Sequence, residues 1–278
     1  MNVRFRTLLR KLLGGIAVIG TLAVTGCASV QTTQSGSVGV ERTQYMSSMV
    51  PEKELEQEAG QQYSDLIQQA KAQGALDRDA AQVARVREIS QRLIAQVSTF
   101  RPDAAAWDWE VHVISSDEVN AWCMPGGKMA VYTGLLTQIK PTDAELAAVM
   151  GHEISHALRE HARERMSQEM VTNVGLSVLA IATGVSTDLG SKLTDVMFTL
   201  PNSRTHESEA DLMGVELAAR AGYDPRAAVT LWQKMGSASS GAPPEFLSTH
   251  PSAATRISEL QAASQRVMPL YEQAKGKK

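Results

Sequence analysis

The chain has 278 residues, of which 43% are hydrophobic, and its 27 basic and 30 acidic side chains give a formal net charge of −3. A weakly acidic chain lacks the excess of positive charge that nucleic-acid-binding proteins need, so that class of function is excluded. Two cysteines cannot build a disulfide framework, so stability must come from a hydrophobic core, for which this length is sufficient.

The N-terminal segment resembles the export signal of a bacterial lipoprotein. Four basic residues precede an apolar run, and small residues then lead into a cysteine: Arg4, Arg6, Arg10, Lys11, 12–24 and Cys27. About thirteen apolar residues are too few for a membrane span, which takes roughly 20, so an uncleaved anchor is the weaker interpretation. The resemblance implies cleavage before Cys27 and a lipid on that cysteine. It also implies lipid anchoring in a bacterial cell envelope, on the periplasmic side of the outer membrane.

Removal of residues 1–26 takes away four basic and no acidic residues, so the mature chain has 23 basic against 30 acidic residues and a formal charge of −7. With Cys27 lipidated, Cys123 is the only free thiol and no intramolecular disulfide can form. Residues 27–50 are rich in Ser, Thr, Gln and Gly without clear periodicity, which predicts a flexible tether. The remainder, residues 51–278, is expected to form a single domain.

The first part of this domain is predicted to contain two helices and a strand. Helical periodicity covers Glu52–Gln73 and Asp79–Val97, and the second helix has an apolar stripe: Val83, Val86, Ile89, Leu93 and Val97. Trp109–Ile114 then has the pattern of a strand.

A second strand is predicted after the turn Pro125-Gly126-Gly127, because the following residues alternate and include β-branched and aromatic side chains: Met129, Ala130, Val131 and Tyr132. We expect this strand to present an open edge, to which an extended polypeptide substrate could add by backbone hydrogen bonds. An ordinary hairpin in a small sheet is an equally compatible interpretation. Cys123 is expected to be a small buried hydrophobic residue near the cleft.

The next helix carries the most informative motif, His152-Glu153-Ile154-Ser155-His156. Thr142 and Glu145 form a capping-box pattern at its start, and apolar residues with helical period follow. Histidines four apart lie on one face of a helix, where both imidazoles can bind one zinc ion. Glu153 beside them can take the proton of a zinc-bound water, so we predict that Glu153 is the general base.

Two segments follow this motif. Val171–Val185 is nearly uncharged but, at about 15 residues, short for a membrane span, so a buried core helix is favoured over a helix that touches a membrane or a partner. Asp188–Asn202 is hypothesised to be a mobile lid over the metal. Asn202 or Ser203 is expected to cap the helix that begins after it.

Arg204–Asp211 supplies candidates for a third metal ligand. Glu207 and Asp211 are four apart, and by themselves they are more typical of a solvated helix face. Together with the histidine motif, they predict Glu207 as a ligand and Asp211 as the partner of the spare N–H of a ligating histidine. Spacing alone leaves Glu209 open as the ligand instead.

These motifs resemble the gluzincin zinc metallopeptidase family of the HtpX, BepA, LoiP and prenyl-protein endopeptidase type. The similarity extends to Asn120–Leu136, with its Pro-Gly-Gly turn, and to Ser248-Thr249-His250-Pro251 with Arg256, so that it covers residues 80 to 265. The resemblance implies an α+β fold, a mainly α-helical zincin-like metallopeptidase domain with a small β-sheet beside the active-site helix.

The resemblance also implies one Zn²⁺ ion per chain and a role for each matching residue. The zinc ligands would be His152, His156 and Glu207. Glu153 would be the catalytic base, and Asp211 would lie behind a ligand. His250 matches a removable extra ligand, and we hypothesise that it is an autoinhibitory fourth zinc ligand. Arg204 and His206 are hypothesised to steady the oxyanion of the tetrahedral intermediate, although both could equally be surface residues.

We therefore predict a zinc-dependent endopeptidase that hydrolyses misfolded or misassembled cell-envelope proteins, with unfolded or outer-membrane proteins as partners and no nucleic acid. The alternative is a non-proteolytic, zinc-stabilised chaperone or assembly factor for outer-membrane proteins, and a metallohydrolase of non-peptide substrates is a third possibility. Glu153 argues against a purely structural site, which needs no base and is usually closed by four protein ligands. The sequence leaves the oligomeric state open.

Overall fold

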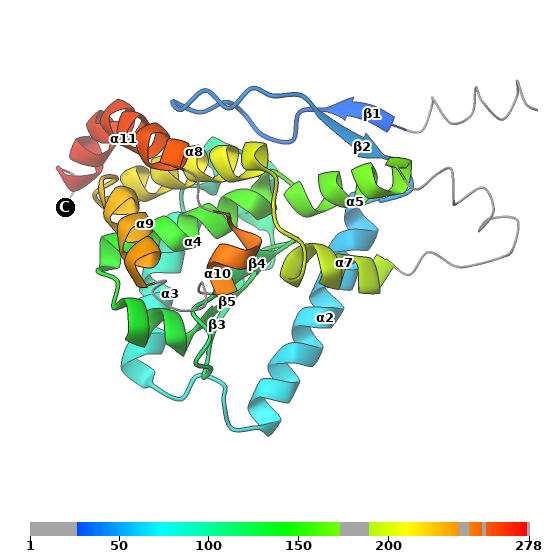
Figure 1. Ribbon diagram of the computed structural model, residues 1–278, viewed down its shortest axis with the longest axis horizontal. Helices are drawn as coiled ribbons and strands as arrows, with labels where there is room; N and C mark the ends of the chain where they lie inside the picture. Colours follow the sequence, from blue (N-terminus) through cyan, green and yellow to red (C-terminus); the bar gives the residue numbers. More distant parts are fainter. Residues whose placement is uncertain (1–26, 173–188, 239–244, 252–253, 277–278) are drawn as a thin grey trace, which may run out of the picture.

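The computed structural model describes residues 27–172, 189–238, 245–251 and 254–276 (Figure 1). The predicted signal segment, residues 1–26, and all but two residues of the run 171–185 lie outside these ranges. Among the helices that are described, none combines the length and the apolar character needed to cross a membrane.

The described chain is mainly helical and has a small sheet, which confirms the predicted α+β class. The α-helices are α2 (Glu52–Ala72), α3 (Ala80–Ile94), α4 (Asp143–Leu158), α5 (His161–Thr172), α7 (Leu189–Phe198), α8 (Arg204–Arg220), α9 (Ala227–Ala238), α10 (Glu245–Thr249) and α11 (Ala254–Lys275). Short turns of 3-10 or π-helix are η1 (Val97–Thr99), η2 (Pro102–Ala106) and η3 (Leu135–Ile139). The strands are β1 (Cys27–Val30), β2 (Gln44–Ser47), β3 (Glu110–Ile114), β4 (Ala121–Met124) and β5 (Lys128–Tyr132).

The main sheet has the strand order β3-β5-β4, with β3 parallel and β4 antiparallel to β5. Gly126 and Gly127 have φ values of +79° and +85°, which glycine adopts readily, and they close the turn that joins β4 to β5. The prediction that Met129–Tyr132 is an edge strand is therefore wrong. Its backbone is paired on both sides because the tight turn folds β4 back against β5, and β4 instead forms the edge beside α4.

Two helices pack unusually closely to form the frame of the site. α4 lies between α8 and the sheet (Figure 1). A Cβ atom on Gly214 would lie only 2.7 Å from the backbone nitrogen of His152, and one on Gly151 would lie 2.9 Å from the carbonyl oxygen of Gly214. The two glycines thus allow the backbones of α4 and α8 to touch, which brings side chains of the two helices within reach of one metal ion.

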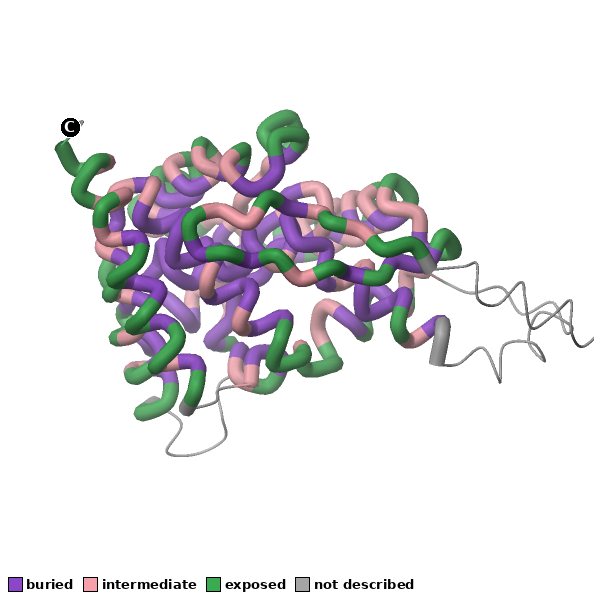
Figure 2. The backbone as a smooth tube through the Cα atoms, turned by 90° about the horizontal axis from the view of Figure 1, so that it is seen from above, coloured by how far each residue is buried: buried purple, intermediate pink, exposed green. Residues whose placement is uncertain are grey.

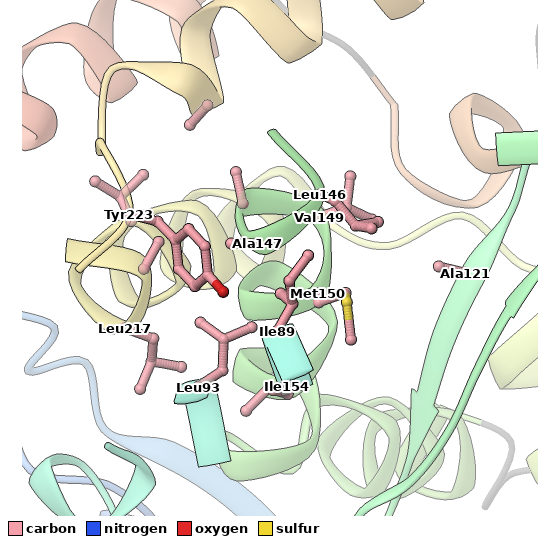
Figure 3. Close-up of a cluster of buried hydrophobic side chains, with 14 of the residues drawn as sticks. Ile89, Leu93, Ala121, Leu146, Ala147, Val149, Met150, Ile154, Leu217 and Tyr223 are labelled. Atoms are coloured by element: carbon pink, nitrogen blue, oxygen red, sulfur yellow. The ribbon is translucent and has the colours of Figure 1, made fainter. Parts of the chain in front are cut away.

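The main hydrophobic core surrounds α4 and includes residues of α3, α8, α9 and α11, several of which are drawn in Figure 3. The predicted apolar stripe is confirmed, since each of its five members is at most 7% exposed: Val83, Val86, Ile89 and Leu93 of α3, and Val97 of η1. A second hydrophobic cluster lies between α2, α5, α7 and the sheet, and in it the rings of Tyr63 and Trp122 pack edge to face. The buried residues fill the interior between the helices (Figure 2).

The N-terminal segment 27–50 is an ordered part of the fold. β1 and β2 form an antiparallel pair, and β2 packs on α5 (Figure 1). Four apolar side chains are buried, each at most 4% exposed: Val38, Val40, Met46 and Val50. The flexible tether predicted for residues 27–50 is therefore wrong, because these four apolar side chains are buried and polar ones, such as Gln44, are hydrogen-bonded inside the protein.

The described part of the predicted lid forms α7 and the turn after it. Leu193 and Val196 are buried against α2 and α5. The guanidinium of Arg165 donates to the carbonyl oxygens of Val196 and Leu200 at 2.8 and 3.0 Å. This segment forms a wall of the cleft described below, and its mobility stays a prediction that hydrogen exchange would test.

Candidate metal centre

Local capping interactions fix the starts of the two helices that supply the candidate ligands. On α4, Thr142 accepts from the backbone N–H of Glu145 at 3.3 Å, and the Glu145 carboxylate accepts from the backbone N–H of Thr142 at 2.8 Å. On α8, the hydroxyl of Ser203 accepts from the backbone N–H of His206 at 3.1 Å. The predicted capping box is thus confirmed, and Ser203 rather than Asn202 caps α8.

The structure brings four candidate ligands together from α4, α8 and the turn after α10. One donor atom from each of His152, His156, Glu207 and His250 lies within 4.8 Å of the other three. His152 Nε2 lies 3.1 Å from His156 Nε2 and 3.2 Å from His250 Nδ1, which in turn lies 3.0 Å from Glu207 Oε1. All four residues are buried or nearly so, so these groups face one another rather than water.

The donor set fits zinc, which prefers imidazole nitrogen and carboxylate oxygen. The Nδ1 of His152 lies 2.9 Å from Asp211 Oδ1 and must donate to it, because an ionised carboxylate can only accept. In its neutral form, His152 then has a free lone pair on Nε2, which points at the other candidate ligands. An ion shared by these lone pairs explains why several imidazole nitrogens approach one another so closely.

Arg256 holds two carboxylates of the site. Its Nε and Nη2 atoms donate to Asp211 at 2.7 and 2.8 Å, and its Nη1 lies 2.7 Å from Glu207 Oε2. Burial would raise the pKa of Asp211, but the charge and hydrogen bonds of Arg256 and His152 outweigh it and lower that pKa. Burial would also raise the pKa of Glu207, which the neighbouring histidines hold well below its usual range. Both carboxylates are therefore ionised.

Glu153 lies beside the ligands without a firm partner. Its side chain is buried, its Oε1 has no hydrogen bond, and the nearest basic atom is His250 Nε2 at 3.4 Å. Burial raises the pKa of Glu153 above its ordinary value. A carboxylate with a raised pKa and an unused oxygen is suited to exchange a proton with a neighbouring group.

A cleft opens beside these residues, between β4, α5 and α7. It is lined by Asn120, Ala121, Trp122, Cys123, Pro125, Glu153, His156, Ala157, Glu160, His161, Ala162, Arg165, Val196, Met197, Phe198, Asn202, Thr249 and His250. Trp122, Met197 and Phe198 make one wall apolar. Cys123 is buried as predicted, and burial followed by the charge of Glu153 raises the pKa of its thiol well above the ordinary value. This thiol is therefore a neutral part of the wall.

Three residues that the sequence suggested for the site lie outside the cluster of candidate ligands. Arg204 is exposed at the start of α8 and does not line the cleft. His206 is buried outside the cleft, with its Nε2 3.2 Å from Glu164, so the geometry supports an oxyanion role for neither. Glu209 points away from the candidate ligands and pairs with Arg42 and Arg159. His206 and Glu209 are one and two positions from Glu207, so on the helix they point to other faces than the one that carries Glu207 and Asp211.

The sequence did not reveal that His161 lies next to the metal ligands. It is five residues beyond His156, a spacing that would place it on another face of a continuous helix. The chain instead breaks at Glu160, which has a φ of +52° in the left-handed region, and α5 starts in a new direction. His161 Nδ1 thereby comes within 2.8 Å of His156 Nδ1. A third histidine close behind the motif was the only signal for it.

Comparisons with known proteins agree on a family. The model of Peptidase family M48 matches residues 80–264. Mitochondrial metalloendopeptidase OMA1 of Arabidopsis thaliana is 41% identical over 156 residues, 56% of this chain and 32% of the relative. Metalloendopeptidase OMA1, mitochondrial, of Bos taurus is 36% identical over 226 residues, 76% of this chain and 42% of the relative. Beta-barrel assembly-enhancing protease of Escherichia coli is 26% identical, covering 75% of this chain and 44% of the relative. The chain thus spans less than half the length of these relatives.

The predicted localisation is contradicted by these relatives. Residues 1–27 predict a bacterial cell envelope, with lipid anchoring on the periplasmic side of the outer membrane, whereas several of the relatives are named as mitochondrial proteins. The physical reason is that basic, acid-free N-terminal segments also serve as mitochondrial transit peptides, so that this composition does not specify one compartment. The residues that carry the prediction, 1–26, lie outside the described ranges.

Proposed function

This chain belongs to Peptidase family M48, a family of zinc metallopeptidases, and we propose that it hydrolyses internal peptide bonds of polypeptides in the cleft beside Glu153. The observation that carries the proposal is the convergence of the candidate ligands His152, His156 and Glu207, together with Glu153, beside that cleft. This set provides three protein ligands and a neighbouring base, which is the arrangement of a hydrolytic rather than a purely structural zinc site.

In the proposed mechanism, His152, His156 and Glu207 would hold a zinc ion. Zinc bound there would supply a Lewis acid that lowers the pKa of water toward about 7 and polarises a substrate carbonyl. Glu153 accepts the proton of the attacking water on a carboxylate oxygen and returns it to the nitrogen of the leaving amine. Its raised pKa makes the protonated form accessible, and the unbonded Oε1 is free to receive the proton.

We propose that the substrate lies as an extended strand along β4. Tyr132 donates its N–H to the carbonyl of Asn120, so the alternation of an antiparallel ladder turns the backbone groups of Trp122 toward β5 and those of Cys123 toward the open edge. Such an edge binds main chain irrespective of sequence and requires it to be unfolded. Misfolded or misassembled proteins meet that requirement, and the name of the E. coli relative supports this substrate class.

His250 is proposed to keep the enzyme latent as a fourth ligand. Its Nδ1 lies 3.2 Å from His152 Nε2 and 3.0 Å from Glu207 Oε1, within reach of the same ion. Its ring stacks on Phe246, with centroids 4.4 Å apart. A catalytic zinc needs an open position for water, so His250 must leave before a substrate is cleaved.

Membrane attachment through Cys27 is a separate proposal that does not depend on the compartment. Small residues lead into this cysteine after an apolar run, which is the pattern that precedes a lipidated cysteine. The mass of the mature N-terminal peptide from wild type and Cys27→Ser tests it. An unmodified Cys27 thiol in the mature protein would rule this attachment out.

The test of the peptidase proposal is cleavage of casein, an unfolded protein, by the zinc-loaded chain, with Glu153→Gln as the matched control. This variant keeps the size and the ligands but cannot accept the proton, so cleavage should fall by at least about 100-fold. His250→Ala should cleave faster than wild type if the enzyme is latent. If all three versions bind zinc and none cleaves casein, a zinc-stabilised chaperone or assembly factor becomes the better explanation.

A further inference from the structure

The two histidines of the motif have different partners behind them. His152 is backed by a carboxylate, because its Nδ1 lies 2.9 Å from Asp211. Behind His156 there is another histidine, since its Nδ1 lies 2.8 Å from the Nδ1 of His161. His161 is 1% exposed, and its second nitrogen, Nε2, lies 3.0 Å from Glu209 Oε2. Three residues therefore form a chain that ends on a metal ligand.

The direction of the hydrogen bonds along this chain follows from its outer end. Arg42 donates to both oxygens of Glu209 at 2.7 and 3.0 Å, and Arg159 Nε donates to Oε2 at 3.2 Å. Two guanidinium groups keep Glu209 ionised, and a carboxylate can only accept. His161 must therefore carry its proton on Nε2, where it donates to Glu209.

The inner end of the chain is His161 Nδ1, which faces His156. The titratable and charged groups around it are Glu209, His156, the stacked ring of His206 at 4.3 Å, and the more distant Glu164, Arg42 and Arg159. The Nε2 of His156 faces His152 Nε2 at 3.1 Å and is the atom that would bind the metal, so a neutral His156 carries its one proton on Nδ1. At a separation of 2.8 Å the two Nδ1 atoms have one proton between them, so His156 donates and the Nδ1 of His161 accepts.

We propose that His161 is a positioning residue for the metal ligand His156: by accepting the Nδ1–H of His156, it leaves the Nε2 lone pair of His156 free and aims it at the metal. This inference rests on the proposed function for the identity of the site, and adds how one ligand is oriented. Glu209 fixes the tautomer of His161 in turn, and Arg42, from the N-terminal segment, fixes Glu209. A residue 110 positions before the first residue of the motif, Arg42 against His152, thus helps to orient a ligand.

Zinc affinity, measured by competition with a chelator on the folded full-length chain, tests the proposal without any need for activity. His161→Leu removes the acceptor and should weaken zinc binding by about 10- to 100-fold, the usual effect of removing the hydrogen-bond partner of a ligand. His161→Asn places an amide oxygen where Nδ1 was and should recover most of the affinity. His206→Leu is the matched control: His206 is equally buried and stacks on His161, but its side chain hydrogen-bonds to Glu164 and to no candidate ligand, and leucine keeps an apolar group against the His161 ring, so zinc affinity should stay within about threefold of wild type.

The outcomes separate this proposal from a general loss of stability and from failure of the peptidase proposal. Equal losses of affinity in His161→Leu and His206→Leu, or no recovery in His161→Asn, would overturn it. If His161→Leu fails to fold, ¹⁵N chemical shifts of the histidine rings in the wild-type chain decide instead. They should show His156 protonated on Nδ1 in the zinc-free and the zinc-loaded protein, and a proton on Nε2 would overturn the proposal. An inert but zinc-binding chain leaves each of these readouts intact.

Discussion

The two sides of the metal centre are built from different parts of the chain. On the side of His152, Asp211 and Arg256 come from α8 and α11, and an ionised carboxylate contacts the ligand directly. On the side of His156, a neutral histidine contacts the ligand, and its carboxylate lies one residue further out, held by Arg42. A direct charge-assisted bond is stronger than a neutral one, so the His152 side should tolerate less disturbance. The His156 side should instead depend on the packing of the N-terminal segment.

The largest effect is expected on the His152 side. Asp211→Asn keeps the size of the side chain but removes the charge that holds both His152 and Arg256. We expect zinc affinity to fall by about 100-fold, the upper end for the partner of a ligand, because Arg256 also loses a buried counter-ion. Isothermal titration with zinc and a competing chelator measures this. A loss smaller than that of His161→Leu would reverse the order of the two sides.

Gly214→Ala tests the frame that the two sides share. The added Cβ would lie 2.7 Å from the backbone nitrogen of His152, so α4 and α8 must move apart. We expect the free energy of unfolding in urea to fall by about 1–3 kcal/mol, as for other overpacked cores. Gly60→Ala in α2 is the control, because a Cβ there meets nothing within 4 Å, and it should be neutral or slightly stabilising. Similar losses in both variants would contradict the close helix contact.

Arg42→Ala tests whether the His156 side depends on the N-terminal segment. The substitution leaves the buried carboxylates of Glu164 and Glu209 with fewer donors. We expect the free energy of unfolding to fall by about 2 kcal/mol and zinc affinity by a few-fold, since Arg159 still holds Glu209. Arg204→Ala, an exposed arginine on α8, should change neither. Unchanged urea stability of Arg42→Ala would mean that the segment does not support the site.

The pH dependence of stability should separate the two sides in the zinc-free chain. Burial would lower the pKa of His152, but Asp211 and Glu207 outweigh it and raise it to about 9, so the stability from this side is complete below about 6.5 and is lost as pH rises through 9. Burial lowers the pKa of His161 to about 3 in the folded chain, whereas in the unfolded chain this histidine takes up its proton near pH 6.5. Stability is therefore lost as pH falls below 6.5 toward 3. Urea midpoints across this range should therefore decline at both ends. Asp211→Asn should flatten only the alkaline decline, and the same flattening at acid pH would contradict this separation.

Local patterns predicted the helices of the site well. The capping box of α4 and the apolar stripe of α3 depend on residues three or four apart, and both are present. The strand Met129–Tyr132 was also correctly recognised as a strand, but its neighbours were not. Strand order is a property of pairing between distant segments, and nothing within five residues tells which edge stays open.

The N-terminal segment shows that amino-acid composition, like local pattern, does not predict contacts with distant parts of the chain. Its polar residues predict a solvated tether, yet Gln44 and Arg42 are placed against Arg159, Glu164 and Glu209. Polar side chains can be buried when partners satisfy them, and those partners lie more than 100 residues away. The composition of a segment shows that burying its polar groups costs free energy. It does not show which distant side chains form the hydrogen bonds that offset this cost.

By itself the sequence determined the chemistry of this protein: two histidines and a glutamate on one helix face, a second acidic helix, and the residue types that zinc binds. Only the tertiary structure decided that Glu207 rather than Glu209 faces the ligands, that β4 rather than β5 is an edge strand, and that His161 contacts His156. The reason is that ligand type follows from side-chain chemistry and local helix geometry. Orientation, by contrast, follows from contacts between elements, such as the Gly151–Gly214 approach and the turn at Glu160, that no local pattern contains.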